Sequence, residues 1–374
     1  MLAAAGIVSV TAAIAASPAD ARASAGQDYP AFALVAGLLL IGLVADDEGL
    51  FAAAGNRLAK LAPSGVALFA GAVILTGLVT ATLNLDTSVA FLTPVLVYAA
   101  RSRSSEEAAL LYGCLLLSNA GSLLLPGSNL TNLIVLGQLR LTGGQFIARM
   151  WLPALAALVV TAVVVAVFER RSLGSQAQRP SEPGAEPGRS RLGWLLGLAA
   201  VVVGTVLVLV LRAPAIPVLL VGVAGASLHL VRGRTRLAEV TQVLGLPVLI
   251  GLFGIAVALG TLGRAWSGPA MLLGHLDSAG TAVLAAGASI LVNNLPAASL
   301  LAARAPAAPF SLLLGLNVGP NLCFTGSLAW LLWLRAARRA GASPRLARAS
   351  VIGAVAVPLA MAAGLAGLIV TGAR

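Results

Sequence analysis

Hydrophobic side chains fill long stretches of this chain, and polar positions fall mainly between those stretches. Residues 199–211, for example, carry Thr205 as their only polar side chain and lack the alternation of a β-barrel strand. Because a helix that crosses a membrane needs about 20 apolar residues, the pattern predicts an all-α polytopic membrane protein. The predicted crossings are residues 1–17, 31–50, 108–139, 150–168, 193–211, 214–231, 243–263, 310–334 and 349–370.

Two other apolar stretches, residues 64–100 and 280–304, are interrupted near their middles by a short polar group. We interpret each stretch as a re-entrant helical hairpin, which enters and leaves the membrane on the same side. The polar residues at the predicted turns, together with one proline, are Asn84, Asp86, Thr87 and Ser88 in the first hairpin and Asn293, Asn294 and Pro296 in the second.

Two of the predicted crossings are broken in the same way. Residues 118–132 and 316–327 each carry Asn-x-Gly, then several residues, then Gly-Ser. Unwound backbone inside a membrane persists only where it lines a cavity, and paired breaks in two halves of a chain point to the binding site of a secondary transporter. The residues that unwind these helices are Gly121, Pro126 and Gly127 in the first break and Gly319, Pro320 and Gly326 in the second.

The order of these elements predicts two inverted repeats, each with a re-entrant hairpin and a broken transmembrane helix. The first repeat covers residues 31–168 and the second covers residues 193–374. Residues 169–192 are rich in Pro, Gly, Ser and Gln and are interpreted as a cytoplasmic linker. Residues 1–30 are interpreted as an N-terminal helix or signal-like segment followed by an external loop.

Charge sets the predicted orientation. Charged residues make up 10% of the chain and hydrophobic residues 59%, whereas about 25% of the residues of a soluble domain are charged. The net charge of +11 would suggest nucleic acid as a partner in a soluble protein, but the arginines lie in short loops and we expect no nucleic-acid partner.

The distribution of basic residues predicts the orientation in the membrane. If the loop after residues 31–50 is inside, the inside loops hold 17 of the 24 basic residues and the outside loops hold 5. The N-terminus is then inside and the C-terminus outside.

The chain shows no sign of an energy-consuming or catalytic site of its own. Lys60, the only lysine, is followed by Leu61, so no Gly-Lys-Ser/Thr phosphate loop exists. No nucleophile, acid–base or HExxH set is found either. We therefore expect no enzyme activity and no cofactor, with a proton or sodium gradient, or a separate ATPase subunit, as the driving force.

The polar side chains at the breaks are all neutral. Unwinding frees carbonyl groups that can hold cations and exposes helix N-termini that favour anions. Small polar residues can also serve close helix packing alone, but their occurrence in pairs favours a site for a small hydroxylated solute, a neutral acid or an oxyanion. With the polar residues of the hairpins, the predicted substrate- or ion-binding residues are Asn119, Ser122, Ser128, Asn129, Thr131, Asn132, Asn317, Asn321, Thr325 and Ser327.

Asp86 is the only charged side chain between Leu61 and Ala100. A lone carboxyl group at membrane depth is costly and usually lines a transport pathway. Burial favours the protonated form, so Asp86 is predicted to bind the coupling proton or a cation. The alternative is that its carboxylate caps a half-helix of the hairpin, and both roles can hold together.

The other residues of interest are given structural roles. The acids that end the crossing 31–50 are interpreted as interfacial, the histidines lack metal-ligand partners, and the cysteines are interpreted as packing residues. We expect no metal site. These residues are Asp46, Asp47, Glu48, His229, His275, Cys114 and Cys323.

Several of these motifs together resemble the bacterial arsenite efflux permeases, within the ion transporter superfamily that also holds sodium–carboxylate symporters and a class of sodium–proton antiporters. The resemblance covers nearly the whole chain after residue 30. The segments that carry it are residues 46–51, Asp86 with residues 92–94, residues 123–132, residues 293–296 and residues 319–334.

The resemblance implies alternating access, with hairpins and broken helices meeting at the membrane midplane, and site residues Asp86, Asn129, Asn132, Asn294 and Ser327. It implies proton-coupled efflux of arsenite or antimonite across the bacterial cytoplasmic (inner) membrane, alone or with a cytosolic ATPase subunit. The alternative is a sodium- or proton-coupled transporter of a citrate- or dicarboxylate-like organic anion, or of an inorganic anion. A homodimer is left open.

The chain departs from these relatives at the second break. Relatives often carry Asp where this chain has Asn317, and some carry Lys where it has Asn321. Because a negative and a positive charge are absent together, the local net charge is the same as in those relatives. The identity of the coupling ion is then left undecided.

Overall fold

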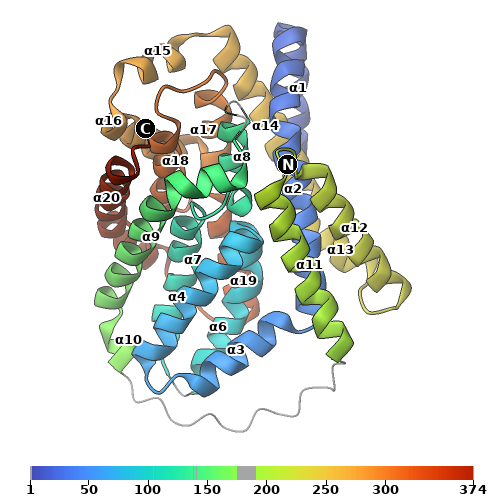
Figure 1. Cartoon of the computed structure of the whole chain (residues 1–374), viewed down its shortest axis with the longest axis vertical. Coiled ribbons are helices and arrows are strands. Elements are labelled where there is room, and N and C mark those ends of the chain that lie inside the picture. Colours follow the sequence, from blue (N-terminus) through green and yellow to red (C-terminus); the bar gives the residue numbers. More distant parts are fainter. Residues whose placement is uncertain (1, 104, 138, 140, 175–190, 374) are drawn as a thin grey trace.

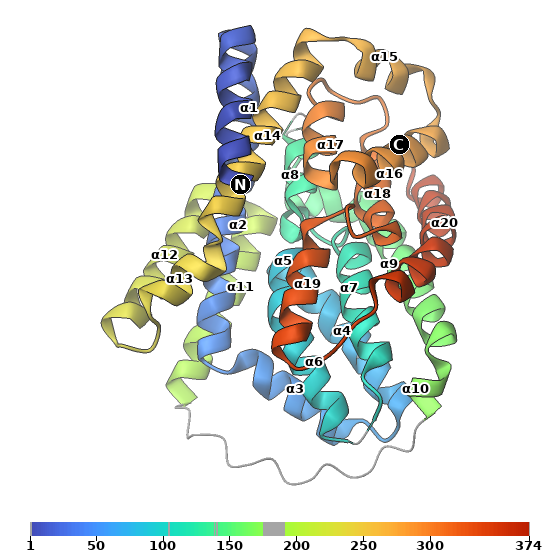
Figure 2. The same ribbon diagram turned by 180° about the vertical axis from the view of Figure 1, so that it is seen from behind.

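The computed structural model describes residues 2–103, 105–137, 139, 141–174 and 191–373, with side chains from residue 194 onward in the last range. Within those ranges the chain forms helices and no strands (Figures 1 and 2). Most of the predicted linker, residues 175–190, lies outside the described residues. Five described helical stretches are long and apolar enough to cross a membrane: Pro18–Asp47, Gly65–Thr82, Gly143–Phe168, Leu237–Ala265 and Leu346–Thr371.

One group of helices packs around the long helix α2. Helix α2 contacts α11, α12, α13 and α14, and α1 lies along α14. The bounds of this group are α1 (Leu2–Ala16), α2 (Pro18–Asp47), α11 (Arg191–Val210), α12 (Ala215–Val231), α13 (Leu237–Leu244) and α14 (Leu246–Ala265).

The remaining helices form two units with similar element order. In the first unit, α3 (Leu50–Leu61) leads to a hairpin and a broken helix: α4 (Gly65–Thr82), α5 (Leu85–Thr87), η1 (Ser88–Leu92), α6 (Thr93–Arg101), α7 (Ala108–Gly121), η2 (Pro126–Ser128), α8 (Leu130–Leu136), α9 (Gly143–Phe168) and α10 (Arg170–Gly174). In the second unit, α15 (Gly268–His275) leads to α16 (Ser278–Val292), α17 (Asn294–Leu301), α18 (Pro309–Val318), η3 (Gly319–Leu322), α19 (Leu328–Arg339) and α20 (Leu346–Thr371).

The two units contact each other along their lengths. Helix α20 lies against α9, and α18 contacts α7 and α8. The base of the first hairpin, near α3, and the base of the second, near α15, lie at opposite ends of the molecule (Figures 1 and 2). A strict inverted symmetry between the units stays a prediction.

Both hairpins turn at an asparagine. Asn84 follows α4 with a φ of 153°, and Asn293 follows α16 with a φ of 76°; they are the only non-glycine residues with positive φ in the described parts of the chain. With ψ of 174° and 149°, both lie in a backbone region that glycine almost alone adopts readily, so local hydrogen bonds must hold each turn. The Asn84 Oδ1 atom accepts from the Thr87 N–H at 2.7 Å, and Asn293 Oδ1 accepts from the Leu295 N–H at 3.5 Å. The predicted hairpins therefore turn at the predicted polar groups.

The N-terminal segment differs from the prediction in one respect. Residues 18–30, predicted as an external loop, are the first thirteen residues of α2. Ser17 is the N-cap, with its hydroxyl oxygen 3.4 Å from the Asp20 N–H, and Pro18 occupies the first turn, where its missing N–H costs nothing. Two polar residues of this segment, Ser24 and Asp28, are buried in the protein, so low hydrophobicity did not mean a loop.

Close packing in several places depends on glycine. A Cβ atom added at Gly254 of α14 would lie 2.0 Å from the carbonyl oxygen of Gly6 in α1. A Cβ atom at Gly353 of α20 would lie 1.8 Å from the carbonyl oxygen of Asn321, inside the second break. Such small residues let backbones approach closely where helices pack in membranes.

Replacing Gly353 by alanine should therefore destabilise the protein. The new methyl group cannot fit without moving α20 away from the second break, which should cost about 1–3 kcal/mol as overpacking does. A lower melting temperature of the detergent-purified protein is the expected result. The matched control is Gly287→Ala in α16, where an added Cβ meets no atom within 4 Å. Equal melting temperatures for the two variants would contradict this packing.

Candidate functional site

The two helix breaks meet at the side chain of Asn317, which is fully buried near the end of α18. Its Oδ1 atom accepts hydrogen bonds from the Ser122 hydroxyl at 2.6 Å and from Asn129 Nδ2 at 2.7 Å. Its Nδ2 atom donates to Asn132 Oδ1 at 2.9 Å. One residue of the second break thus bonds to three residues of the first.

Further contacts extend this junction on both sides. The Ser327 hydroxyl donates to Asn119 Oδ1 at 3.3 Å, and Asn321 Nδ2 donates to the Leu116 carbonyl at 2.9 Å. Thr131 lies with its hydroxyl 3.5 Å from the same Asn317 oxygen. The predicted helix-breaking residues of the two breaks lie in or beside these irregular segments. Pro296, also predicted to break a helix, is instead the third residue of α17.

Each hairpin tip is bonded to the break of its own unit. In the first unit, Ser88 and Ser118 hydroxyls lie 3.1 Å apart, and the Ser128 hydroxyl donates to the Ala81 carbonyl at 3.3 Å. In the second unit, the Asn294 N–H donates to the Gly326 carbonyl at 2.9 Å. The chain of contacts therefore runs from one tip, through both breaks, to the other tip.

The second tip carries two more bonds of this kind. Asn293 Nδ2 donates to the Thr325 carbonyl at 3.1 Å, and the Thr325 hydroxyl donates to the Ile290 carbonyl at 2.8 Å. Unlike the residues of the junction, Thr325 is exposed.

The junction is closed rather than open to a ligand. Asn317, Ser122 and Asn132 have no exposed surface, and Asn129 is 6% exposed. Buried amides and hydroxyls must be paired, and here they are paired with one another. These residues hold the broken helices together in this conformation, so a solute would reach them only after a rearrangement.

Asp86 is placed differently from the other predicted site residues. It is half-buried and lines a cavity of about 710 Å³ between α2, the second arm of the first hairpin, α13–α14 and α19. Asp86 makes no hydrogen bond or ion pair with any residue that the structure describes. Asn84 Nδ2 and Thr87 Oγ1, on either side of it in sequence, are buried and unpaired among the described residues. The hairpin tip therefore keeps hydrogen-bonding capacity that the fold does not use.

The cavity has an apolar interior and a charged mouth. Its apolar lining comes from residues such as Phe91 and Leu328, and its volume is in the range of sites for small molecules. Asp86 is at the tip of the hairpin, whereas the charged lining residues lie toward the helix ends. Those charged residues are Asp46, Asp47, Arg234, Glu239, Arg335 and Arg339.

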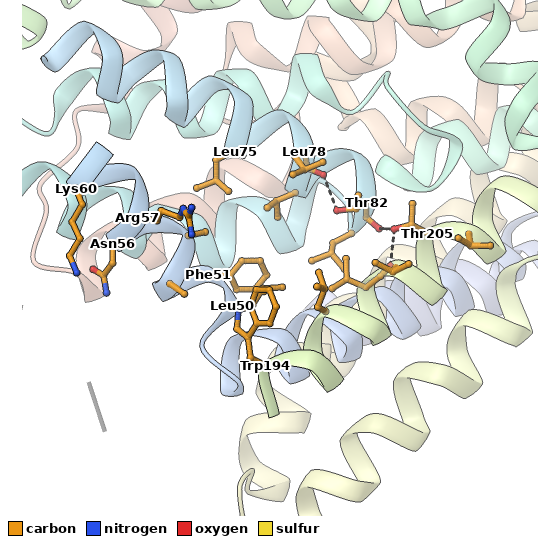
Figure 3. Close-up of a pocket in the computed structure, with 18 residues that line it drawn as sticks. Leu50, Phe51, Asn56, Arg57, Lys60, Leu75, Leu78, Thr82, Trp194 and Thr205 are labelled. Carbon is orange, nitrogen blue, oxygen red and sulfur yellow. Dashed lines mark hydrogen bonds between the residues drawn. The ribbon is translucent and has the colours of Figure 1, made fainter. Parts of the chain in front are cut away.

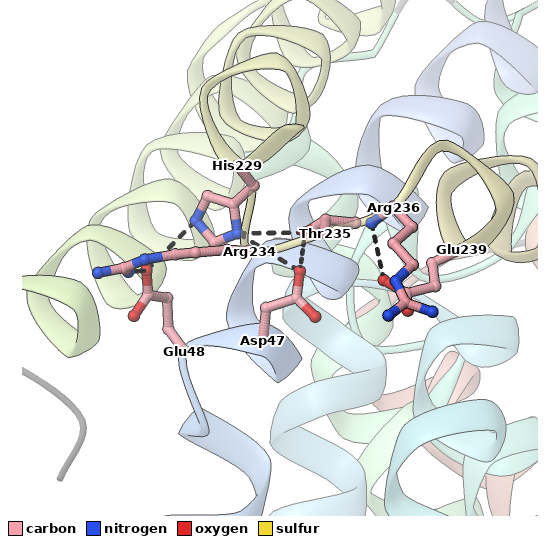
Figure 4. A network of polar contacts seen from close by, with 7 residues as sticks. All are labelled: Asp47, Glu48, His229, Arg234, Thr235, Arg236 and Glu239. Atoms are coloured by element: carbon pink, nitrogen blue, oxygen red, sulfur yellow. Dashed lines mark hydrogen bonds and ion pairs between the residues drawn. The ribbon is translucent and has the colours of Figure 1, made fainter. Parts of the chain in front are cut away.

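A network of ion pairs fixes one side of the mouth (Figure 4). His229, 1% exposed at the end of α12, lies 3.4 Å from Asp47 Oδ2 through Nδ1 and 3.3 Å from Glu48 Oε1 through Nε2. Arg234 also pairs with Glu48, and the Thr235 hydroxyl donates to Asp47. Glu48 is 3% exposed, so this acid is buried within the network, while its predicted position at the membrane interface stays a prediction. The network ties the end of α2 to the loop after α12.

One buried acid was missed by the sequence interpretation. Asp28 of α2 is 1% exposed, and its Oδ2 atom accepts from the Ser299 hydroxyl of α17 at 3.4 Å. Its neighbour Gln27 donates to the carbonyls of Ile134 at 3.1 Å and Ala302 at 2.9 Å, which joins α2 to both units. The sequence offered one signal, an acidic residue close to an apolar run. Because residues 18–30 were predicted to form an external loop, this acid was expected to face water.

Comparison with known proteins identifies a matching family and several relatives of this chain. A family profile described as "Citrate transporter" (CitMHS) matches residues 1–334. The "Arsenical pump membrane protein" of Escherichia coli is 26% identical over 329 residues, covering 79% of this chain and 76% of that protein. A protein of the same description from Shigella flexneri has the same identity and coverage.

The fold also has a counterpart among solved structures. The YdaH transporter of Alcanivorax borkumensis aligns with a TM-score of 0.55 and 15% sequence identity, over 94% of this chain and 86% of that one. At this identity the likeness concerns the fold alone. Helices, broken segments and sequence relatives agree on a multi-pass membrane transporter rather than an enzyme, and the chain belongs to the citrate transporter (CitMHS) family.

Proposed function

We propose that this transporter exports arsenite or antimonite, as small neutral hydroxylated acids, in exchange for protons. The observation that carries the proposal is that one fold holds both a carboxyl group without an ionic partner among the described residues, Asp86, and a separate junction of neutral amides and hydroxyls around Asn317. Neutral donors and acceptors suit a solute that carries hydroxyl groups and no charge. The E. coli relative named as an arsenical pump membrane protein supports the same substrate class.

Asp86 is proposed to carry the coupling proton. A carboxyl group without an ionic partner costs least when protonated, and Asp86 reaches the cavity while sitting on the tip of a hairpin. Protonation and deprotonation would change the charge of the tip, and the bonds from Ser88 and Ser128 would transmit a shift of the tip to the first break. By the positive-inside rule, the cavity mouth with its three arginines faces the cytoplasm, and the cavity is then the route by which the solute enters.

The alternative, a transporter of an organic or inorganic anion, has its own support. The family profile is described as a citrate transporter, and Arg234, Arg335 and Arg339 line the cavity mouth. These cations could attract an anion. Arg234 is already paired with Glu48, and no arginine lies in the junction, which favours the neutral solute for the inner site.

Substrate counterflow in proteoliposomes separates the two functions. Vesicles loaded with arsenite should exchange it with external arsenite, and a proton gradient should drive net movement while a sodium gradient should not. Citrate and sulfate should neither exchange nor compete. Exchange of citrate that depends on sodium would instead support the anion transporter.

Replacing Asp86 by asparagine should abolish proton-driven transport while the protein remains folded. The amide keeps the size of the side chain but cannot exchange a proton. The readout is arsenite movement in proteoliposomes under an imposed pH gradient, beside the melting temperature. Asp277→Asn, the same change at an exposed helix N-cap that asparagine also satisfies, should transport normally. Normal proton-driven transport by the Asp86 variant would remove the coupling role.

Replacing Asn317 by alanine should damage both stability and transport. The change leaves the buried polar atoms of Ser122, Asn129 and Asn132 without a shared partner, at about 1–3 kcal/mol for each unsatisfied group. We expect a clearly lowered melting temperature and little or no counterflow. In the control Thr161→Ala, a buried hydroxyl that bonds only within its own helix is lost, and the effect should be small. Wild-type stability of the Asn317 variant would show that the junction contributes little.

A further inference from the structure

A second, larger cavity lies on the other side of the first hairpin. It has a volume of about 1130 Å³ and is lined by α3, the second half of α4 and α11 (Figure 3). We call it the α3–α4–α11 groove. None of the polar residues of the junction lines it, so it is separate from the candidate site.

The chemistry of the groove changes along its length. Most of its lining is apolar and part of it is exposed, with Leu78 59%, Val202 50% and Val206 50% accessible. Among the residues whose side chains the structure describes, the charged residues that line the groove are Arg57 and Lys60 of α3, and both are exposed. Figure 3 shows these two residues at one end of the groove and the threonines of α4 and α11 at the other. The described part of the lining contains no acidic side chain.

The groove is about as deep as one leaflet of a bilayer. Its lining on α11 extends from Trp194 to Val206, which corresponds to about 18 Å of helix at about 1.5 Å per residue. One leaflet of the hydrocarbon core is about 15 Å thick. Trp194, at the same end as α3, is the kind of residue that sits at the membrane–water interface.

We infer that the α3–α4–α11 groove binds an anionic phospholipid of the leaflet on the α3 side. The phosphate and its acidic headgroup pair with Arg57 and Lys60, and an acyl chain lies along the apolar walls of α4 and α11. Charge complementarity selects this occupant, because a neutral apolar molecule would leave both cations unused. Glu48, which lies near Gly197 of α11, does not oppose this since it is paired with His229 and Arg234.

A lipid in the α3–α4–α11 groove would lie against the first hairpin and affect its movement. At the inner end, the Thr205 hydroxyl is 3.4 Å from the Thr82 carbonyl, where α11 meets the last residue of α4. Thr82 is two residues before the tip at Asn84. An acyl chain in the groove therefore packs between α11 and the helix that carries the tip, and its presence or absence should alter how easily that helix moves.

Native mass spectrometry of the full chain, exchanged into mixed micelles with equal phosphatidylglycerol and phosphatidylethanolamine, tests the inference. The wild type should retain phosphatidylglycerol preferentially. The double variant Arg57→Gln, Lys60→Gln should lose about tenfold or more of this retention, because each basic residue contributes about 1 kcal/mol to binding of an anionic lipid. Val202→Trp, which fills the groove, should reduce retention of both lipids.

The control is Arg170→Gln with Arg171→Gln, two exposed cations of α10 outside the groove. It should change retention less than twofold, which separates a site from general attraction to a basic face. Lipid retention is compared only among variants whose melting temperature and monodispersity match those of the wild type. Unchanged retention in the Arg57, Lys60 variant, or an equal loss in the control, would overturn the inference. So would efficient crosslinking of two copies through Ala53→Cys, because a second copy would then occupy the groove.

Discussion

The need to pair buried polar groups at the two helix breaks controls the centre of this structure. Breaking a helix within a membrane exposes backbone and polar side chains that lipid cannot satisfy. The two breaks satisfy each other: Asn317 of the second break bonds to Ser122, Asn129 and Asn132 of the first. Neither unit could keep its unwound segment in this form without the other. The junction is thus both the structural link between the units and the polar centre of the proposed site.

The first hairpin lies between two different environments. One side faces the cavity that Asp86 lines, with a charged mouth, and the other faces the apolar α3–α4–α11 groove with its two cations. The tip itself is held by few bonds, through Ser88 and Ser128. In the proposed function, this hairpin responds both to proton binding at Asp86 and to the lipid in the groove.

Fold and site were predictable to different degrees. Apolar runs predicted the helices, whereas Gly and Pro residues predicted both breaks and, with Asn84 and Asn293, both hairpin turns. These features were predictable because they depend on local chain chemistry. Asp86 was identified by its isolation among apolar residues. The loop predicted for residues 18–30 was wrong because the cap at Ser17 and burial against other helices outweigh low hydrophobicity. Asp28 was missed for the same reason.

The sequence by itself determined that this chain is a helical membrane protein with paired breaks, since composition, helix-breaking residues and turn residues act over a few positions. Only the tertiary structure decided which polar residues are satisfied and which remain available. Asn317 and its partners are 185 or more positions apart and are closed into a network, whereas Asp86 is left open to a cavity. That difference depends on which helices pack together, and no local pattern encodes the distance between residues so far apart in the chain.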